Sequence, residues 1–150
     1  MAQAESSKHL LDGFPHAAMQ FFRALEANRR NATVAFGLSE MEMRALFRIA
    51  EAGSITPKAL AADLVVTTGA VTGVSDRLIN AGLVIRTAHP DDRRSLLLEL
   101  TDAGHEAMAD MHRDFIGMLM GAADPIDPVE LEVAARTLRS IAEGAQRRLD

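Results

Sequence analysis

Cysteine, tryptophan and tyrosine are all absent from this chain. Without cysteine the protein cannot form a disulfide framework, a thiolate zinc site or a thiol-based redox sensor. Only 4% of the residues are aromatic, so few side chains are available to stack on single-stranded bases. These absences exclude several classes of redox and metal protein and disfavour a single-strand binder.

Long apolar runs are absent as well. No stretch approaches the roughly 18 consecutive apolar residues that a membrane-spanning helix needs. The N-terminal segment lacks the apolar core of a signal peptide; it reads MAQAESSKHLLDGF. We therefore expect no membrane partner, and a cytoplasmic location is the default expectation.

Catalytic and metal-binding motifs are not found in the sequence. It has no nucleophile elbow, no phosphate-cradling glycine loop and no paired metal motif, so we expect neither an enzyme nor a cofactor. The eight methionines are typical of core filler, or of an adaptable pocket lining. The five histidines do not follow a metal-ligand spacing: His9, His16, His89, His105 and His112. His105 and His112 are seven residues apart on a predicted helix, so a metal-responsive regulator stays open as an alternative.

The amino-acid composition is that of a globular protein. It has 150 residues, of which 48% are hydrophobic and 25% charged, which favours one domain or one domain plus pairing helices. The net charge of −5 would argue against a nucleic-acid partner if it were evenly spread. Residues 56–100, however, hold equal numbers of basic and acidic side chains, so the middle of the chain is less acidic than its flanks.

Capping residues predict the first two helices. The first begins near Asp12 and closes at the basic pair Arg29 and Arg30, which suit the negative end of a helix. The second opens on the capping box Ser39-Glu40-Met41-Glu42 and stops at Gly53. Its predicted apolar stripe comprises Met43, Leu46, Phe47 and Ala50.

The middle of the chain has the pattern of a helix-turn-helix. Thr56-Pro57 caps a short helix over residues 57–64, and a tight connection over residues 65–67 follows. Thr67 or Thr68 caps the next helix, which runs to about Asn80 and stops at Gly82. Two short helices joined so closely are typical of this motif. The apolar positions of the second helix point inward: Val71, Val74 and Leu78.

A β-hairpin is predicted directly after these helices. Residues 83–87 have the β-branched content of a strand, His89-Pro90-Asp91-Asp92 is a turn, and residues 95–100 form the return strand. Thr101 then caps a long helix, and Asp127-Pro128 opens a final one. The predicted fold class is therefore mainly α with a small β-hairpin wing, a winged helix-turn-helix between helices at both ends.

Residues 38–104 resemble the MarR family of bacterial winged helix-turn-helix transcriptional regulators. Each motif is short, but their order and spacing together are specific, and a helix before and two after this block match the family's arrangement. The motifs are Leu60-Ala61-x-x-Leu64, Asp76-Arg77-Leu78, Gly82-Leu83-Val84, Asp92-x-Arg94, and Leu100-Thr101 with Gly104.

The resemblance implies a homodimer that binds double-stranded DNA. Residues 8–36 and 101–148 would form the helical dimerisation part, and residues 38–100 the DNA-binding part. Each chain would present one winged helix to half of a palindromic operator, with half-sites roughly 34–36 Å apart. The function implied is that of a repressor.

The outward face of the second helix is the predicted DNA-reading surface, and it comprises Thr68, Gly69, Ala70, Thr72, Gly73 and Arg77. The threonines can donate to a phosphate or base edge, and their methyl groups can pack on thymine. Arg77 can reach phosphate; the alternative is a surface ion pair with Asp76 or Asp92. Many family members carry a larger polar or basic residue where this chain has Gly73, so direct readout loses a contact and weight shifts toward the wing.

The resemblance also assigns roles to the wing. It implies that Arg94 enters the minor groove, that Arg93 lies beside it for phosphate, and that Asp92 holds the wing by ion pairing. The alternative is a solvated charged turn that makes no contact with DNA.

A small aromatic or phenolic effector is the expected partner besides DNA, bound between the dimer body and the winged helices. Two other functions remain open: a winged-helix module that binds a protein and not DNA, and the metal-responsive regulator. The weak ligand candidates are His16, Met19, Phe22, Phe47 and Arg48.

Overall fold

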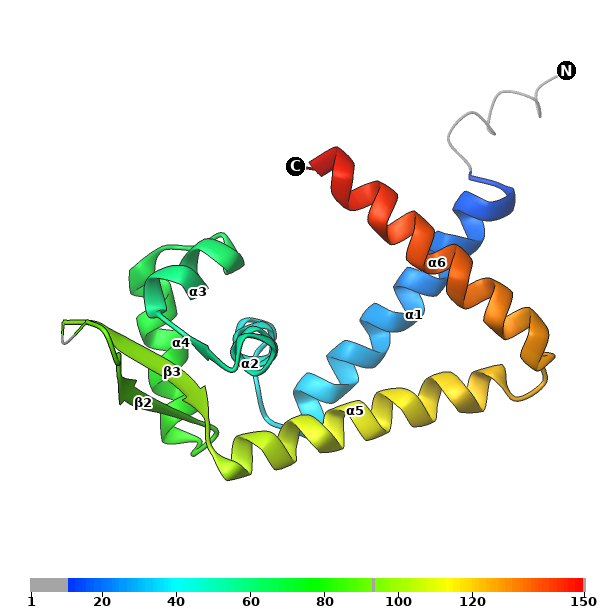
Figure 1. Ribbon diagram of the computed structural model, residues 1–150. Coiled ribbons are helices and arrows are strands. Elements are labelled where there is room, and N and C mark those ends of the chain that lie inside the picture. Colours follow the sequence, from blue (N-terminus) through cyan, green and yellow to red (C-terminus); the bar gives the residue numbers. More distant parts are fainter. Residues whose placement is uncertain (1–10, 93, 150) are drawn as a thin grey trace, which may run out of the picture. The chain divides into compact units, whose positions relative to one another are not determined.

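The computed structural model describes residues 11–92 and 94–149 of the chain. The described residues fall into two compact units, one up to residue 111 and one from residue 112 onward. The elements follow one another as α1 (Gly13–Ala35), α2 (Glu40–Ala52), β1 (Ser54–Ile55), α3 (Pro57–Leu64), α4 (Thr68–Asn80), β2 (Val84–Ala88), β3 (Leu96–Leu100), α5 (Asp102–Ala123) and α6 (Pro128–Leu149) (Figure 1). This order confirms the predicted winged helix-turn-helix.

Side-chain caps form at the predicted starts of α2, α3, α4 and α5. In the capping box of α2, Glu42 N donates to Ser39 Oγ at 3.2 Å and Ser39 N donates to Glu42 Oε2 at 2.8 Å. Thr56 and Thr67 accept from backbone amides at the starts of α3 and α4. Thr101 does the same for α5. These local bonds set where each helix begins.

The end of α1 differs from the prediction. The helix does not close at the basic pair but continues to Ala35, and Gly37 follows with a φ of 64°. No glycine or proline stands between Arg30 and Gly37, so the helix has nothing to stop it earlier. Asp12 occupies the N-cap position as expected, but its side chain makes no capping hydrogen bond.

A three-stranded antiparallel sheet has the order β1-β3-β2. Ile55 of β1 and Arg86 of β2 both lie opposite Leu98, which places β3 in the centre. The sequence did not predict β1, because a two-residue strand carries no periodicity and exists only through its pairing with β3.

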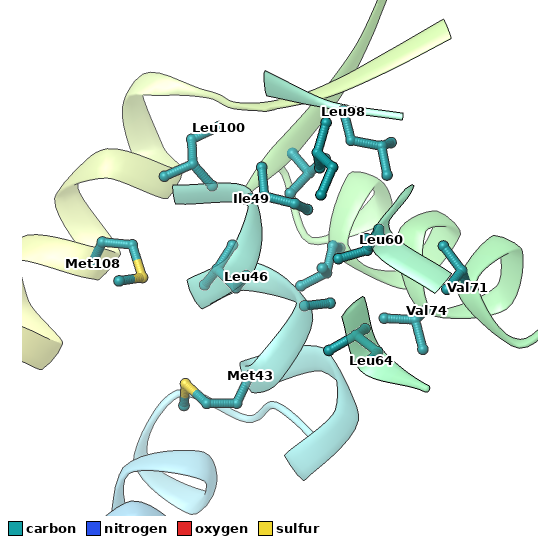
Figure 2. Close-up of a cluster of buried hydrophobic side chains, with 14 of the residues drawn as sticks. Met43, Leu46, Ile49, Leu60, Leu64, Val71, Val74, Leu98, Leu100 and Met108 are labelled. Atoms are coloured by element: carbon teal, nitrogen blue, oxygen red, sulfur yellow. The ribbon is translucent and has the colours of Figure 1, made fainter. Parts of the chain in front are cut away.

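The hydrophobic core of the first unit lies around α2. Figure 2 shows side chains of α3, α4, β3 and α5 gathered about it, with Leu46 and Ile49 near the centre. The predicted stripe of α2 was partly wrong: Ala45 and Ile49 are fully buried, whereas Phe47 is 37% exposed and Ala50 half-buried. The buried face is wider than one stripe, because α2 contacts α3, α4 and the sheet.

Gly104 makes the junction between the hairpin and α5 possible. A Cβ built on this residue would stand 2.1 Å from the carbonyl oxygen of Leu83, so no larger residue fits without movement of the backbone. Thr101 ties the same junction, since its hydroxyl donates to Gly82 O at 2.6 Å and its amide donates to Leu83 O at 3.1 Å. The wing is therefore fastened to the start of α5 by close backbone contacts.

In the second unit, α6 carries many exposed apolar side chains. Asp127 caps the helix, accepting from Val129 N at 2.8 Å, as predicted. Leu138 is 51% and Ile141 is 42% exposed, and both lie on the predicted apolar side of the helix. No helix within residues 11–149 is long and apolar enough to cross a membrane.

Candidate nucleic-acid interface

The second helix of the helix-turn-helix, α4, presents the predicted residues outward. Its inward positions Val71, Val74 and Leu78 are buried, and so is Ser75. Gly73 is half-buried, and the other members of the predicted surface are exposed: Thr68, Gly69, Ala70, Thr72 and Arg77. The structure therefore gathers all six residues on one accessible helix surface.

The turn before α4 is held in an unusual conformation. Val65 adopts a left-handed φ of 56°, and its side chain is 88% exposed. The amide of Val65 donates to Ala62 O at 3.1 Å, and that of Val66 donates to Ala61 O at 3.0 Å. These bonds end α3 and turn the chain directly into α4, so the strained residue fixes the angle between the two helices.

The hydroxyl of Thr72 is committed within the helix. Its Oγ1 donates to the carbonyl oxygen of Thr68 at 3.0 Å. In this rotamer Thr72 keeps its lone pairs and its methyl group for a partner, but not its proton. It is therefore suited to accept a hydrogen bond from a base amino group or to pack on a thymine methyl. Donation of a hydrogen bond to DNA, which the sequence also suggested, would require the hydroxyl to leave Thr68 O.

The ion pair of Arg77 is not the one the sequence suggested. Its Nε donates to Oε1 of Glu42 at the start of α2, and not to Asp76 or Asp92. Asp76 instead pairs with Arg86 of β2 at 2.6 Å. Both pairs join α4 to a neighbouring element, so the Asp76-Arg77 dipeptide anchors the helix on two sides.

Glu42 is a buried carboxylate with a full set of partners. Burial by itself would raise its pKa, but hydrogen bonds from the Ser39 amide and the Arg77 guanidinium hold the pKa of Glu42 below its ordinary value. The group therefore stays ionised, and its charge is matched by Arg77. The sequence signal for this residue was the capping box, which did not reveal its contact with α4.

The wing turn is held by hydrogen bonds. Asp92 Oδ1 accepts from Arg94 N at 3.0 Å, and Asp92 O accepts from Ser95 N at 3.0 Å. The Arg94 amide and the Ser95 side chain lower the pKa of Asp92. Within the described part of the wing Asp92 acts through these hydrogen bonds, and its expected ion pairing stays a prediction. Arg94 is exposed, and Arg93 lies outside the described residues.

The five ligand candidates do not come together in one place. Phe47 and Arg48 line a hollow of about 260 Å³ whose walls also include Arg29, Met43, Arg44, Asp63 and Leu64. His16 and Met19 line a separate hollow on α1, and Phe22 lines neither of these two. The candidate set therefore divides into a group on α2 and a group on α1.

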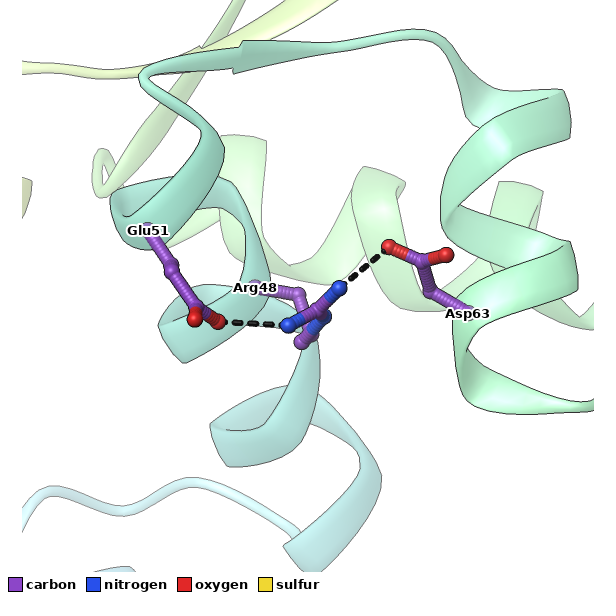
Figure 3. Close-up of polar contacts among 3 residues, drawn as sticks. All are labelled: Arg48, Glu51 and Asp63. Carbon is purple, nitrogen blue, oxygen red and sulfur yellow. Dashed lines mark hydrogen bonds and ion pairs between the residues drawn. The ribbon is translucent and has the colours of Figure 1, made fainter. Parts of the chain in front are cut away.

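Arg48 ties α2 to α3 across the first hollow. Figure 3 shows its guanidinium between two carboxylates, Glu51 of α2 and Asp63 of α3, the latter at 2.6 Å. Asp63 and then Glu51 raise the pKa of Arg48. An anion entering the hollow would meet a cation that already has partners, so its binding would compete with the link between the helices.

The acidic and histidine side chains of the described residues are dispersed. In that part of the chain no group of three or more histidine, aspartate or glutamate side chains is placed to hold a metal ion. His9 lies outside the described residues.

Comparison with known proteins gives one consistent family. The family model described as MarR family matches residues 38–96. The HTH-type transcriptional regulator YcgE of Bacillus subtilis is 30% identical over 120 residues, covering 77% of this chain and 78% of YcgE. The solved structure of RV1404 from Mycobacterium tuberculosis superposes with a TM-score of 0.79 at 24% identity, covering 89% of this chain and 95% of that one.

A further solved structure carries a small molecule. NadR, in complex with 4-hydroxyphenylacetate, superposes with a TM-score of 0.63 at 20% identity, covering 88% of this chain and 94% of NadR. At this identity the likeness establishes the fold of the chain.

Proposed function

Since the chain belongs to the MarR family of DNA-binding transcriptional regulators, we propose that it is a homodimeric repressor, that it binds a palindromic operator, and that a small molecule releases it. The observation that carries this proposal is the accessible surface of α4, followed along the chain by a wing whose Arg94 is exposed. A helix of this kind fits the major groove of duplex DNA.

The proposed DNA contacts divide between α4 and the wing. The six outward residues of α4 would lie in the major groove: Thr68, Gly69, Ala70, Thr72, Gly73 and Arg77. Arg94 would enter the adjacent minor groove, where a narrow A·T-rich stretch concentrates negative potential, with Arg93 on a nearby phosphate. Asp92 supports this role because its bonds to the backbone shape the turn that carries Arg94.

Exposed apolar surface supports the proposed dimer. On α1, Phe14 is 58% and Phe22 is 52% exposed, and α6 exposes Leu138 and Ile141. Residues 8–36 and 101–148 would supply helices that bury these side chains against a second copy, because contiguous apolar helix faces are unfavourable in water. A two-fold dimer would in turn require a two-fold operator.

Release by a small aromatic or phenolic molecule is proposed on two grounds. Phe47 and Arg48 both line one hollow, so an aromatic ring bearing an acidic group would pack near Phe47 and compete with Asp63 and Glu51 for the Arg48 guanidinium. NadR, which shares the fold, is known with 4-hydroxyphenylacetate bound. Such a ligand would release DNA by favouring a conformation of the dimer that misfits the operator. The second group of candidates is His16, Met19 and Phe22.

A genomic selection followed by mobility-shift titration tests the function. The full chain is mixed with fragmented duplex DNA from its source genome, bound fragments are sequenced, and the recovered sites are titrated at several salt concentrations. We expect recovered sites with two-fold symmetry and a steep loss of affinity as salt rises. Absence of sequence-selective, salt-sensitive binding would overturn the repressor and favour a winged-helix module that binds a protein.

A further inference from the structure

Arg77, Glu42 and Gly73 form a small arrangement on the surface of α4. Both oxygens of the Glu42 carboxylate are committed, Oε1 to Arg77 Nε and Oε2 to the Ser39 amide. The carboxylate side chain is 9% exposed, whereas the Arg77 side chain is 59% exposed. The anion thus lies below the surface and is fixed, and the cation lies above it and is accessible.

The bond to Glu42 determines which donors of Arg77 remain. Because Nε is engaged, the plane of the guanidinium is fixed and the Nη groups form its available edge. Nη1 stands 3.7 Å from the point where a Cβ on Gly73 would lie, so the guanidinium extends over the outward face of α4. A Cβ at position 73 would make only an ordinary van der Waals contact with this group, so Arg77 lies over the Gly73 position without requiring a glycine there.

The position of Arg77 along α4 indicates the kind of DNA atom it meets. Base edges are read mainly by residues near the start of a recognition helix, and Arg77 lies in the last turn of α4. A phosphate at the rim of the groove is the acceptor within reach of such a residue, and phosphate contacts set the register of the helix on the duplex. A guanidinium held in place loses less conformational freedom on binding than a free one.

We propose that Glu42 is a positioning residue for DNA binding: it holds Arg77 over Gly73 so that the free edge of the guanidinium binds one backbone phosphate and sets the register of α4 in the major groove. This inference rests on the proposed placement of α4 on DNA. It predicts that a buried acid strengthens selective binding to an anionic polymer, which general electrostatics alone would not predict.

The test compares three single variants and one double variant on two duplexes. The first duplex is a site recovered by the genomic selection, and the second has the same length and a random sequence. Arg77→Ala should weaken binding to the selected site by on the order of tenfold to a hundredfold and reduce the slope of log affinity against log salt by about 1. Glu42→Gln should weaken binding to the selected site several-fold but should not weaken binding to the random duplex, because the variant carries one negative charge fewer.

Ser39→Ala, the third variant, separates the positioning of Arg77 from the stability of the fold. Glu42 both caps α2 and holds Arg77, and Glu42→Gln keeps the first role because glutamine can still cap the helix through its side-chain oxygen. Ser39→Ala removes the hydroxyl that accepts from Glu42 N and leaves the contact with Arg77 in place. We expect Ser39→Ala to lower the melting temperature and to leave affinity for the selected site unchanged.

Further outcomes decide the proposal. In an Arg77→Ala background, Glu42→Gln should have no added effect on the selected site, since the positioned group is gone. Equal losses on both duplexes, additive losses in the double variant, or an unchanged salt slope for Arg77→Ala would overturn the role of Glu42 while leaving the regulator intact. A wild-type protein without selective binding would overturn both proposals.

Discussion

Val65 shows how a single residue shapes the helix-turn-helix. A β-branched side chain in the left-handed region crowds its own backbone, which costs roughly 1–2 kcal/mol per residue. Asparagine tolerates this region far better, and the exposed Val65 side chain contributes little packing. We expect Val65→Asn to raise the free energy of unfolding by about 1 kcal/mol in urea denaturation.

The neighbouring residue supplies the control for this prediction. Val66 is half-buried, packs against the core and has an ordinary φ. The same change there, Val66→Asn, should destabilise the protein, because it places an amide against apolar side chains. If both variants lost stability alike, the left-handed strain assigned to Val65 would be wrong.

Arg94 is the second residue whose removal has a defined consequence. We expect Arg94→Ala to weaken binding to the selected operator by about 1–3 kcal/mol in a mobility-shift titration, because the wing loses its groove contact. Arg136→Ala removes the same charge from α6, outside the winged helix, and serves as the control. Equal losses for the two variants would point to net charge and would contradict the groove contact.

At the scale of elements, the sequence predicts those helix starts that local hydrogen bonds determine. The starts of α2, α3, α4, α5 and α6 follow from caps that join residues two or three positions apart. Features that depend on distant contacts were missed or misassigned. β1 exists only through β3, and the partner of Arg77 lies 35 positions away on α2.

The candidate site follows the same division. Periodicity alone separates the outward face of α4 from its buried face, so the predicted DNA surface could be read from the sequence. The ligand candidates could not be grouped, because α1 and α2 are separate helices whose facing residues have no common sequence pattern. Gly104 belongs to the family motif, but its physical reason, the approach of Leu83 O, is visible only in three dimensions.

The Glu42–Arg77 contact between α2 and α4 makes the stability of the fold depend on pH. The folded pKa of Glu42 lies below its ordinary value of 4.5, so the ionised carboxylate contributes stability above the ordinary pKa. This contribution is lost as pH falls through the folded pKa, because the protonated group no longer pairs with Arg77. We expect wild type to unfold at higher urea than Glu42→Gln at pH 7, and the difference to shrink below pH 4.5.

The pH series has its own control. Thr56→Ala removes a neutral cap from α3 that has no part in the Glu42 pair, so its deficit relative to wild type should change much less over the same pH range. A Glu42→Gln deficit that stayed constant down to the lowest pH would contradict the assignment of the effect to the charged pair.

At the scale of the whole molecule, the acidic balance is compatible with DNA binding. The chain carries a net charge of −5, yet residues 56–100, which include α3, α4 and the wing, have no net charge. Only the surface that faces the duplex needs positive side chains, and the acidic flanks limit non-specific attachment to DNA. We therefore expect selectivity to depend on a few placed arginines.

The exposed apolar side of α6 bears on the size of the particle. Leu138 and Ile141 lie on one side of the helix and Ser140 on the opposite side, since successive residues are 100° apart. If a second copy covers the apolar side, Leu138→Asp places a charge in the interface and should convert a two-chain particle into a single chain of 16.2 kDa, as measured by sedimentation equilibrium. Ser140→Asp introduces the same charge on the opposite side and should leave the mass unchanged.

The monomeric variant should also lose affinity for a two-fold operator, because each chain would hold only one half-site. A Leu138→Asp protein that kept the mass of wild type would contradict the proposed interface.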